Sequence, residues 1–505
     1  MSTGTNMEAI GRLLSPQSIA LVGATENSFW SFSIIENLRT LGYQGAIHLV
    51  HPTKATQFGA RCYPSVRDIP GPVDHAWVMT ATGVAMSVLQ DCAAKGIRSV
   101  TMLTAGFKEV GPEGARLERE LVQFCRDHEM TLLGPNCLGF LNGRLQIPAY
   151  ALLLGEAPIP GHIGVVLQSG ALLLHFHRLA VNRGIGLSYL VSSGNEGMLD
   201  ATDFLRFMVE NPETKVVAAL LEGIRDPQAF KEIADRAMAL GKPMVVLKTG
   251  RSQAASRSAT AHTGALTGVD AVVDAYLRQL GVLRVDSVEE LVETAGLLQA
   301  RGWPEAGRRA GVVTPSGGSC GIFADICHNK AIELPDFSAT TKERLKEILP
   351  DFGTAQNPLD PTGYVVIDGT LIPRTLEVIA RAPECDMVVV VTDPPTEPGL
   401  NPQRTRDRLE RLAAAVAGSS KYVCLVSTVA GELTKFGRSA VAEFGLHTAN
   451  GLTLGAAALD RAIRYGEARG RYLARNESAS PLPDQTDRSD RSEAFKGRHG
   501  ALNEA

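Results

Sequence analysis

Short apolar runs recur along the sequence, and each is followed by a glycine-containing or polar turn and then by apolar positions at helical spacing. The first run, Ser18–Val22, ends in Gly23-Ala24-Thr25 and precedes a stretch with helical spacing at residues 33–41. A short continuous apolar run predicts a buried strand, and helical spacing predicts an amphipathic helix. The pattern therefore predicts repeated strand–turn–helix units, which are typical of α/β proteins.

The predicted units fall into three groups. Residues 151–160 combine prolines and glycines and indicate a linker, and Arg301–Pro304 indicates a second boundary. The other strand-like runs are at 46–50, 99–103, 130–133, 163–167, 187–192, 216–221, 241–248, 310–314, 387–392 and 422–427. We predict an α/β fold of three consecutive doubly wound domains, at 8–150, 160–300 and 308–470, with the first Rossmann-like. Residues 475–505 are polar and charged, which predicts a disordered tail.

Composition narrows the class of protein. The 505 residues include 50 glycines, 44% hydrophobic residues and only 6% aromatic residues, which suits an Ala/Gly/Val-rich α/β protein of about three domains. The formal net charge is −4 and no Lys/Arg block stands out, so nucleic-acid binding is not expected. The eight scattered cysteines form no CxxC pair, and no run approaches the ~18 apolar residues of a membrane helix. We expect a cytoplasmic protein with no membrane segment and no metal site.

One histidine stands in a loop of small residues, Ser258–Asp270. His262 is framed by Ala, Thr and Gly, which leave room for a bulky modified form of the imidazole. The loop follows the strand-like run at 241–248, and α/β sheets usually place their chemistry at the carboxyl ends of strands. We therefore interpret His262 as a covalent phosphate carrier, and the alternative is an ordinary surface histidine.

Three further motifs follow predicted strands. Ser169-Gly170-Ala171 leads into a predicted helix at 172–182, which Ser169 can cap, and Ser316-Gly317-Gly318 leads into a predicted helix at 322–330. Backbone N–H groups at these two helix starts can bind an anion. Glu222 ends the strand at 216–221, so its carboxylate could bind one ring nitrogen of His262 and stabilise the charged ring. The alternatives are an ordinary helix cap at Ser169 and a structural ion pair between Glu222 and an arginine.

The first group of strands predicts a site for a phosphate-bearing ligand. Gly23 is not followed by the second and third glycines of a dinucleotide-binding loop, and the strand at 46–50 ends in His51-Pro52, with no acidic residue for a ribose. NAD binding is therefore disfavoured, but the helix after Gly23 could bind another phosphate. Lys54 offers a point charge for such a ligand, or is a solvated surface lysine.

The strand at 130–133 leads into Gly134-Pro135-Asn136-Cys137-Leu138-Gly139. Cys137 is a candidate nucleophile, but no histidine lies nearby in the sequence to activate it. A small packing residue is therefore the favoured interpretation of Cys137. Asn136 is the better candidate for a polar contact with a ligand.

These motifs together resemble the NDP-forming acyl-CoA synthetases, the superfamily of succinyl-CoA synthetase and ADP-forming acetyl-CoA synthetase. The segments Ala255–Gly264 and Gly268–Asp270 resemble its phosphohistidine loop, and the resemblance extends from about Leu13 to about Tyr465. It implies a Rossmann-like CoA-binding domain followed by two flavodoxin-like domains. The sequence departs from the family pattern at Phe29-Trp30-Ser31 and at Thr80-Ala81.

The resemblance also implies a role for each motif. His262 would carry the phosphoryl group and Glu222 would orient it. The two phosphate-facing helix starts would contain Ser169, Gly170, Ala171, Gly317 and Gly318. CoA would contact Gly23, Ala24, Thr25, Pro52 and Lys54. Asn136 and Cys137 would lie near the reacting thioester. The implied reaction converts a carboxylic acid, CoA and a nucleoside triphosphate into acyl-CoA, nucleoside diphosphate and phosphate through an acyl phosphate. The acyl group and the choice of ATP or GTP stay open.

No stretch of the sequence resembles the ATP-grasp region that loads phosphate in this superfamily, and no Walker-type loop replaces it. We therefore expect Mg and ATP or ADP to bind only through a separate ATP-grasp β-type subunit, with this chain as the homodimeric core of a hetero-oligomer. One alternative is a non-catalytic CoA-binding scaffold or regulatory protein, and another is an NAD(P) oxidoreductase. Retention of His262, Glu222 and both helix starts argues against the scaffold, because a pure binder needs none of them.

Overall fold

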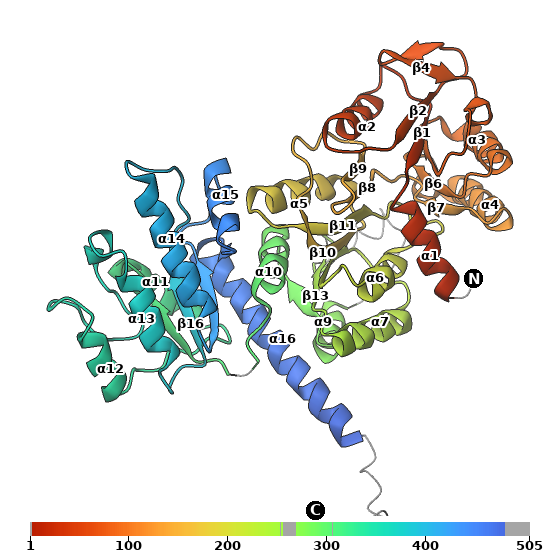
Figure 1. The fold of residues 1–505 in the computed structure, drawn as a ribbon. Helices are drawn as coiled ribbons and strands as arrows, with labels where there is room; N and C mark the ends of the chain where they lie inside the picture. The colour runs from red at the N-terminus through yellow and green to blue at the C-terminus, as the bar shows by residue number, and fades with distance from the viewer. Residues whose placement is uncertain (1–2, 253, 256–268, 306, 480–505) are drawn as a thin grey trace, which may run out of the picture.

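Figure 1 shows the computed structural model of the chain, which describes residues 3–252, 254–255, 269–305 and 307–479. The chain forms three α/β units in sequence order, each built on a mainly parallel sheet with helices on its faces. The second unit (yellow to green) lies between the first (red to orange) and the third (green-blue to blue). The predicted α/β fold of three consecutive doubly wound domains is confirmed.

The first sheet has the strand order β3-β4-β2-β1-β5-β6-β7, in which all neighbours are parallel except β3 and β4. Its strands are β1 (Ser18–Val22), β2 (Ala46–Val50), β3 (Thr56–Gln57), β4 (Ala60–Tyr63), β5 (His75–Val78), β6 (Ser99–Met102) and β7 (Thr131–Leu133). Its helices are α1 (Thr3–Leu13), α2 (Phe29–Thr40), α3 (Thr82–Lys95) and α4 (Pro112–Asp127), with 3-10 turns η1 (Val66–Asp68) and η2 (Lys108–Val110). Helix α2 begins earlier than predicted because Ser28 caps it, its side chain accepting the N–H of Ser31.

The second sheet has the order β14-β13-β12-β10-β11-β8-β9. Its parallel strands are β10 (Pro160–Leu167), β11 (Leu187–Ser192), β12 (Val216–Leu221), β13 (Met244–Lys248) and β14 (Leu283–Val285). Its helices are α5 (Gly170–Asn182), α6 (Ala201–Glu210), α7 (Pro227–Leu240), α9 (Asp270–Gln279) and α10 (Val288–Arg301). Strand β10, the first of the parallel set, lies between β11 and β12, which is the order of a flavodoxin-like sheet.

A hairpin of β8 (Gly139–Asn142) and β9 (Ile147–Tyr150) extends the second sheet, because β8 pairs antiparallel with β11. The predicted first domain, 8–150, therefore includes two strands that belong to the second sheet. All side chains of both strands are buried, so their apolar pattern predicts a strand but not the sheet that the strand joins.

The third sheet is parallel, with the order β15-β16-β17-β18. Its strands are β15 (Ala310–Val313), β16 (Met387–Val391), β17 (Tyr422–Val426) and β18 (Thr448–Ala449). Its helices are α11 (Gly317–Cys327), α12 (Ala339–Lys346), α13 (Leu371–Ala380), α14 (Pro402–Ala417), α15 (Lys435–Glu443) and α16 (Gly451–Ala479), with the 3-10 turn η3 (Gly363–Val366). Helix α16 continues through residues 475–479, so the predicted disordered tail is wrong for these residues, and 480–505 lie outside the described residues.

The second and third units share one hydrophobic core. Helices α5 and α10 of the second unit and α11 and α16 of the third contribute to a single cluster of buried side chains; α10 and α16 lie between the two sheets in Figure 1. The cluster includes Phe176 of α5, Leu298 of α10, Phe323 of α11 and Leu459 of α16. The predicted boundary at 301–304 therefore separates two sheets but not two cores.

A buried ion pair lies in the same layer. Arg183, at the end of α5, places its Nε 3.1 Å from Oε1 of Glu293 on α10, and both side chains are almost fully buried. Arg183 also donates to the carbonyl oxygens of Gly431 and Thr448 in the third unit, at 3.0 and 2.7 Å. The arginine thus joins the two units through charge-assisted hydrogen bonds, while Glu293 of the second unit balances its charge.

Candidate functional site

The carboxyl end of β1 makes a tight turn at Gly23. This residue has φ of +87°, and its N–H donates to Val50 O at 2.9 Å. A Cβ atom at position 23 would lie 3.0 Å from the carbonyl oxygen of Met79, so any other residue would be both strained and crowded. Glycine at this position therefore allows the chain to pass close to β5 before α2 begins.

The turn after β2 lies beside Gly23, because β1 and β2 are parallel neighbours. His51 Nδ1 accepts a hydrogen bond from the N–H of Lys54 at 3.2 Å, which shapes this turn. Pro52 and Lys54 are exposed, whereas Ala24 is fully buried. The structure thus brings these predicted residues to one edge, but Ala24 can offer a ligand only its backbone.

Three aromatic side chains at the start of α2 are exposed next to this edge. Phe29, Trp30 and Phe32 are 56%, 42% and 44% exposed, and the rings of Phe29 and Trp30 meet edge to face with centroids 6.4 Å apart. The N–H of Thr25 donates to Ser31 Oγ at 3.2 Å, which ties the turn after β1 to this helix start. The departure from the family pattern at 29–31 therefore places apolar surface beside the turn.

Asn136 and Cys137 lie where the first unit meets the second. Asn136 has φ of +53°, and its side-chain amide donates to Asn195 Oδ1 at 3.2 Å. The Cys137 thiol donates to Ser192 O at 2.9 Å, and burial raises its pKa to about 12. A thiol with this pKa is protonated at neutral pH, so the structure favours packing for Cys137 and leaves Asn136 as the polar candidate.

The start of α5 has backbone N–H groups that Ser169 does not cap. Ser169 occupies the N-cap position, but its side chain makes no capping hydrogen bond, so the predicted cap is wrong. Gly170 lies against Leu138, where a Cβ atom would come within 3.0 Å of that side chain. Without a capping hydroxyl, the first N–H groups of α5, including that of Ala171, keep the capacity to bind an anion.

The start of α11 differs from that of α5. Ser316 caps this helix, its Oγ accepting the N–H of Ser319 at 3.4 Å. The carboxylate of Asp360 lies close to Gly317, 3.1 Å from the position of a Cβ atom there. Gly317 and Gly318 therefore leave the backbone open, but an anion at this helix start would also meet a carboxylate.

Glu222 follows β12 at the same edge as the start of α5. Its N–H donates to Gln168 Oε1, and the N–H of Gly223 donates to the same oxygen at 3.3 Å. The ammonium group of Lys248, at the end of β13, donates to the carbonyl oxygens of Glu222 and Thr249 at 2.8 and 2.6 Å. Burial, followed by the charge of Arg284, lowers the pKa of Lys248. The backbone at Glu222 is thus held from both sides.

His262 lies outside the described residues, as does the rest of 256–268. The described chain on either side ends at β13 and resumes at Val269, which precedes α9. Strand β13 pairs with β12 in parallel register, with Lys248 opposite Leu221. The role of His262 stays a prediction, while Glu222 lies next to the strand from which its loop departs.

Several polar residues of the site were not predicted as site residues. Asn195 and Glu196 follow β11, and both are buried. Glu109, Glu118 and Arg225 contact this turn from other elements. The signal that could have found Asn195 and Glu196 is their place after the buried strand β11, which is the neighbour of the strand that precedes Ser169.

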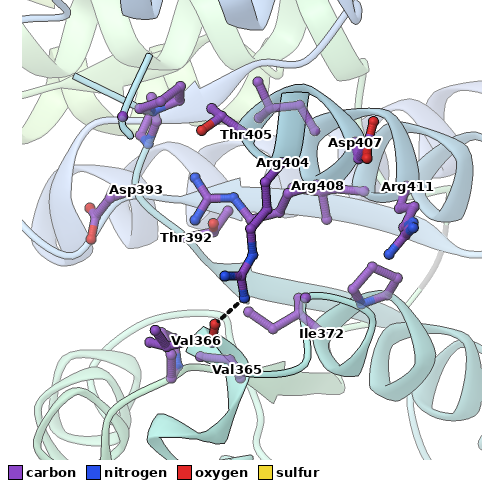
Figure 2. A pocket seen from close by; sticks show the side chains of 18 of the residues that line it. Val365, Val366, Ile372, Thr392, Asp393, Arg404, Thr405, Asp407, Arg408 and Arg411 are labelled. Atoms are coloured by element: carbon purple, nitrogen blue, oxygen red, sulfur yellow. Dashed lines mark hydrogen bonds between the residues drawn. The ribbon is translucent and has the colours of Figure 1, made fainter. Parts of the chain in front are cut away.

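A cavity of about 1190 Å³ lies in the third unit, between α14 and the segment formed by η3 and the start of α13 (Figure 2). Arg404 crosses it and donates to Val366 O at 2.6 Å, and Arg408 also points into it from α14. Alternate residues of β16 face the two opposite faces of the third sheet. Val388 packs on the face that carries α13 and α14, and Val389 packs on the other face, which carries α11 and α16. The cavity therefore opens away from the second unit, and no predicted site residue lines it.

Within the described ranges, no group of three or more His, Cys, Asp or Glu side chains is arranged to hold a metal ion. None of the helices in the described part of the chain is long and apolar enough to cross a membrane.

Two domain families match the chain. A family described as a CoA binding domain matches residues 17–143, and a succinyl-CoA ligase like flavodoxin domain matches residues 160–298. The two matches fall on the first and second units, and the gap between them contains strand β9 of the hairpin.

Relatives of known name match most of the chain. It is 35% identical over 82% of its length to acetate–CoA ligase [ADP-forming] I of Archaeoglobus fulgidus, and 33% identical over 76% to 4-hydroxybutyrate–CoA ligase [ADP-forming] of Nitrosopumilus maritimus. It spans only 58% and 54% of those two proteins. By contrast, it is 30% identical to the acetate–CoA ligase [ADP-forming] II subunit alpha of Pyrococcus furiosus, over 81% of this chain and 88% of that subunit.

A solved structure agrees with the sequence comparisons. The acetyl-coenzyme A synthetase 1 of Ca. Korarchaeum cryptofilum, solved with phosphate and ADP, matches with a TM-score of 0.78 and 29% identity, covering 92% of this chain and 98% of that chain. The match extends through all three units, because it covers nearly the whole of the described chain. By its domain matches, its relatives and its fold, the chain belongs to the NDP-forming acyl-CoA synthetase family.

Proposed function

We propose that this chain is the α-type component of an NDP-forming acyl-CoA synthetase. It would interconvert a carboxylic acid, CoA and a nucleoside triphosphate with acyl-CoA, nucleoside diphosphate and phosphate. Asn136, the uncapped start of α5 and the backbone of Glu222 all lie around one turn, at the edge where the first two units meet. This arrangement is the observation that carries the proposal. A thioester held by the first unit and a phosphate held by the second could meet there.

The first unit supplies the CoA site in this proposal. The tight turn at Gly23 and the start of α2 offer backbone N–H groups for a phosphate, and Lys54 adds a positive charge at the same edge. Pro52 and Thr25 border the same turn, and Ala24 contributes its backbone. Asn136 lies at the carboxyl end of the same sheet and provides a polar contact near the reacting end of CoA.

The phosphoryl group then passes through His262. Phosphate attacks the acyl carbon of acyl-CoA, CoA leaves as the thiol, and acyl phosphate forms. A nitrogen of His262 attacks the phosphorus, the carboxylate leaves, and phosphohistidine remains. Glu222 orients the ring through its other nitrogen and balances the charge, while the N–H groups at the starts of α5 and α11 bind the phosphoryl oxygens. Transfer to a nucleoside diphosphate completes the reaction, and each step is reversible.

The nucleotide would bind, with Mg, to an ATP-grasp β-type subunit, around a homodimer of this chain. Support comes from the Pyrococcus furiosus relatives named as alpha subunits, of whose lengths this chain covers 88% and 82%. All eight cysteines are unpaired and buried, which supports a reducing compartment such as the cytoplasm.

The test is phosphorylation of the purified chain by acetyl phosphate, labelled at phosphorus, with CoA present and no nucleotide. Wild type should acquire an acid-labile, base-stable label, and His262→Ala should acquire none while binding CoA as before. Labelling that persists in the variant would reject His262 as the carrier. Tight CoA binding with no labelling of wild type would instead favour the non-catalytic scaffold, and preferential binding of NAD would favour an oxidoreductase.

A further inference from the structure

The turn Ser193–Glu196, called here the 193–196 loop, joins the first unit to the second. Glu196 has φ of +56°, a conformation that non-glycine residues rarely adopt, and it is 5% exposed. Backbone strain of this kind persists only where surrounding contacts fix it, and it is frequent at functional sites. The contacts of Glu196 are therefore informative.

The carboxylate of Glu196 is fully engaged. Its Oε1 accepts hydrogen bonds from Gln168 Nε2 at 2.9 Å, Ser193 Oγ at 2.9 Å and the N–H of Ala201 at 3.0 Å. Its Oε2 lies 3.2 Å from the guanidinium of Arg225. A buried carboxylate with these partners has one orientation.

That orientation fixes Gln168. Because Gln168 Nε2 donates to Glu196, its Oε1 faces the other way, toward the N–H groups of Glu222 and Gly223. Gln168 is also the residue before Ser169, which precedes α5. One amide side chain thus connects Glu196, the start of α5 and the backbone of Glu222.

The other half of the 193–196 loop faces the first unit. Asn195 Oδ1 accepts from Asn136, and Asn195 Nδ2 donates to Glu118 at 3.0 Å and to Glu109. Burial raises the pKa of Glu109, but hydrogen bonds from Asn195 and from backbone N–H groups outweigh it and hold the pKa below its usual value. The contact with Asn195 is therefore with an ionised carboxylate at neutral pH.

We propose that Glu196, Gln168 and Asn195 are positioning residues, which hold the carboxylate of Glu222 and the amide of Asn136 in register across the boundary between the two units. The proposal rests on the proposed function for its kinetic consequence. The structural part of the proposal is that Glu196 holds the backbone at Glu222 in place through Gln168, and this part depends only on the hydrogen bonds described above.

The test is the Glu196→Gln variant, which keeps size and shape but removes the charge that fixes the Gln168 amide. Phosphorylation by acetyl phosphate should slow about 10- to 100-fold, the range typical of residues that orient a reacting group, with the KM for CoA unchanged. Hydrogen–deuterium exchange of the peptide containing Glu222 and Gly223 should accelerate, because their N–H groups lose a fixed acceptor.

Glu293→Gln is the matched control. Glu293 is also a buried carboxylate paired with an arginine and bonded to a backbone N–H, that of Asn450 at 3.0 Å, but it lies at the other boundary. Its variant should change stability without slowing phosphorylation of the folded protein.

The proposal is overturned if Glu196→Gln matches Glu293→Gln in both rate and exchange. Faster exchange with an unchanged rate would equally reject the positioning role. If wild type forms no phosphohistidine, the proposed function fails, and the exchange comparison still decides whether Glu196 holds Glu222.

Discussion

The two boundaries between units both bury apolar side chains, but they differ in their polar contacts. Where the first unit meets the second, an apolar cluster that includes Leu14 and Phe207 is joined, at the carboxyl edge, by polar contacts of Asn195 with Asn136, Glu109 and Glu118. Where the second meets the third, the shared core contains the Arg183–Glu293 ion pair, at the opposite end of α5 from Ser169. The polar contacts at the first boundary fix directions of candidate reacting groups, whereas those at the second fix only how two sheets pack.

The difference predicts that the two boundaries respond differently to substitution. Changes at the second boundary should lower the free energy of unfolding and leave the activity of each folded molecule intact. Changes to the polar contacts at the carboxyl edge of the first boundary should lower the activity of the folded protein and change the free energy of unfolding little. The predictions below test this separation, beginning with the largest expected change in free energy.

Arg183→Ala should be the most destabilising of these changes, by about 3–5 kcal/mol, because it leaves the Glu293 carboxylate buried without its partner. Denaturant unfolding measures the loss, and phosphorylation of the folded fraction should stay at the wild-type rate. The Arg183→Met/Glu293→Leu double variant removes both charges and should recover much of the loss. A loss below about 1 kcal/mol in the single variant would contradict the structural role of the pair.

Glu222→Gln should have the opposite profile. Phosphorylation should slow on the order of 100-fold, about 2.7 kcal/mol in activation free energy, because a neutral amide cannot stabilise a charged imidazole ring. The unfolding midpoint should change little, because the substitution keeps the backbone hydrogen bonds of Glu222 with Gln168 and Lys248. A near-wild-type rate would mean that the Glu222 carboxylate has only a structural role.

Acid should weaken the first boundary through His75. This residue of β5 is fully buried, its ring lies 5.8 Å from that of Phe140 in the hairpin, and burial lowers its pKa to about 3. Above pH ~6.5 both folded and unfolded chains hold a neutral ring, but between ~6.5 and 3 only the unfolded chain binds the proton, so stability falls as pH falls.

Between pH 7 and pH 5 the loss from His75 should be about 2 kcal/mol. Comparing urea unfolding of wild type with His75→Gln at both pH values isolates this contribution, because glutamine does not titrate in this range. An equal pH dependence in the two proteins would show that His75 is not the group responsible.

The regular elements were accessible from sequence wherever side chains on both faces of a strand are buried. Strands β11 and β12 have the predicted bounds, and β1 does too, since continuous apolar runs of this length admit few alternatives. Helix starts were less accurate. Helix α11 begins at Gly317, before the predicted start at Ile322, because the Ser316 side chain caps a glycine-rich turn that carries no apolar signal.

The candidate site was only partly accessible. Position after a strand identified Glu222, Ser169 and Asn136 as candidates, because that rule depends on local sequence alone. The bonds from Glu196 to Gln168, and from Asn195 to Asn136, join segments far apart in the chain, and no local pattern encodes them. The missing cap at Ser169 could not be predicted from local sequence either, because only the backbone geometry decides whether a serine hydroxyl reaches the N–H groups of the helix.

The β8–β9 hairpin has a consequence for dividing the protein into pieces. A fragment ending at residue 150 would carry β8 without its partner β11, and would expose a row of unpaired backbone groups that favours edge-to-edge association. A fragment beginning after 150 would lack Tyr150, whose hydroxyl donates to Gly170 O at 2.8 Å at the start of α5. The first unit therefore cannot be exchanged between relatives as a separate fragment. A chimeric protein would need the hairpin to be exchanged together with the second sheet, which the hairpin completes.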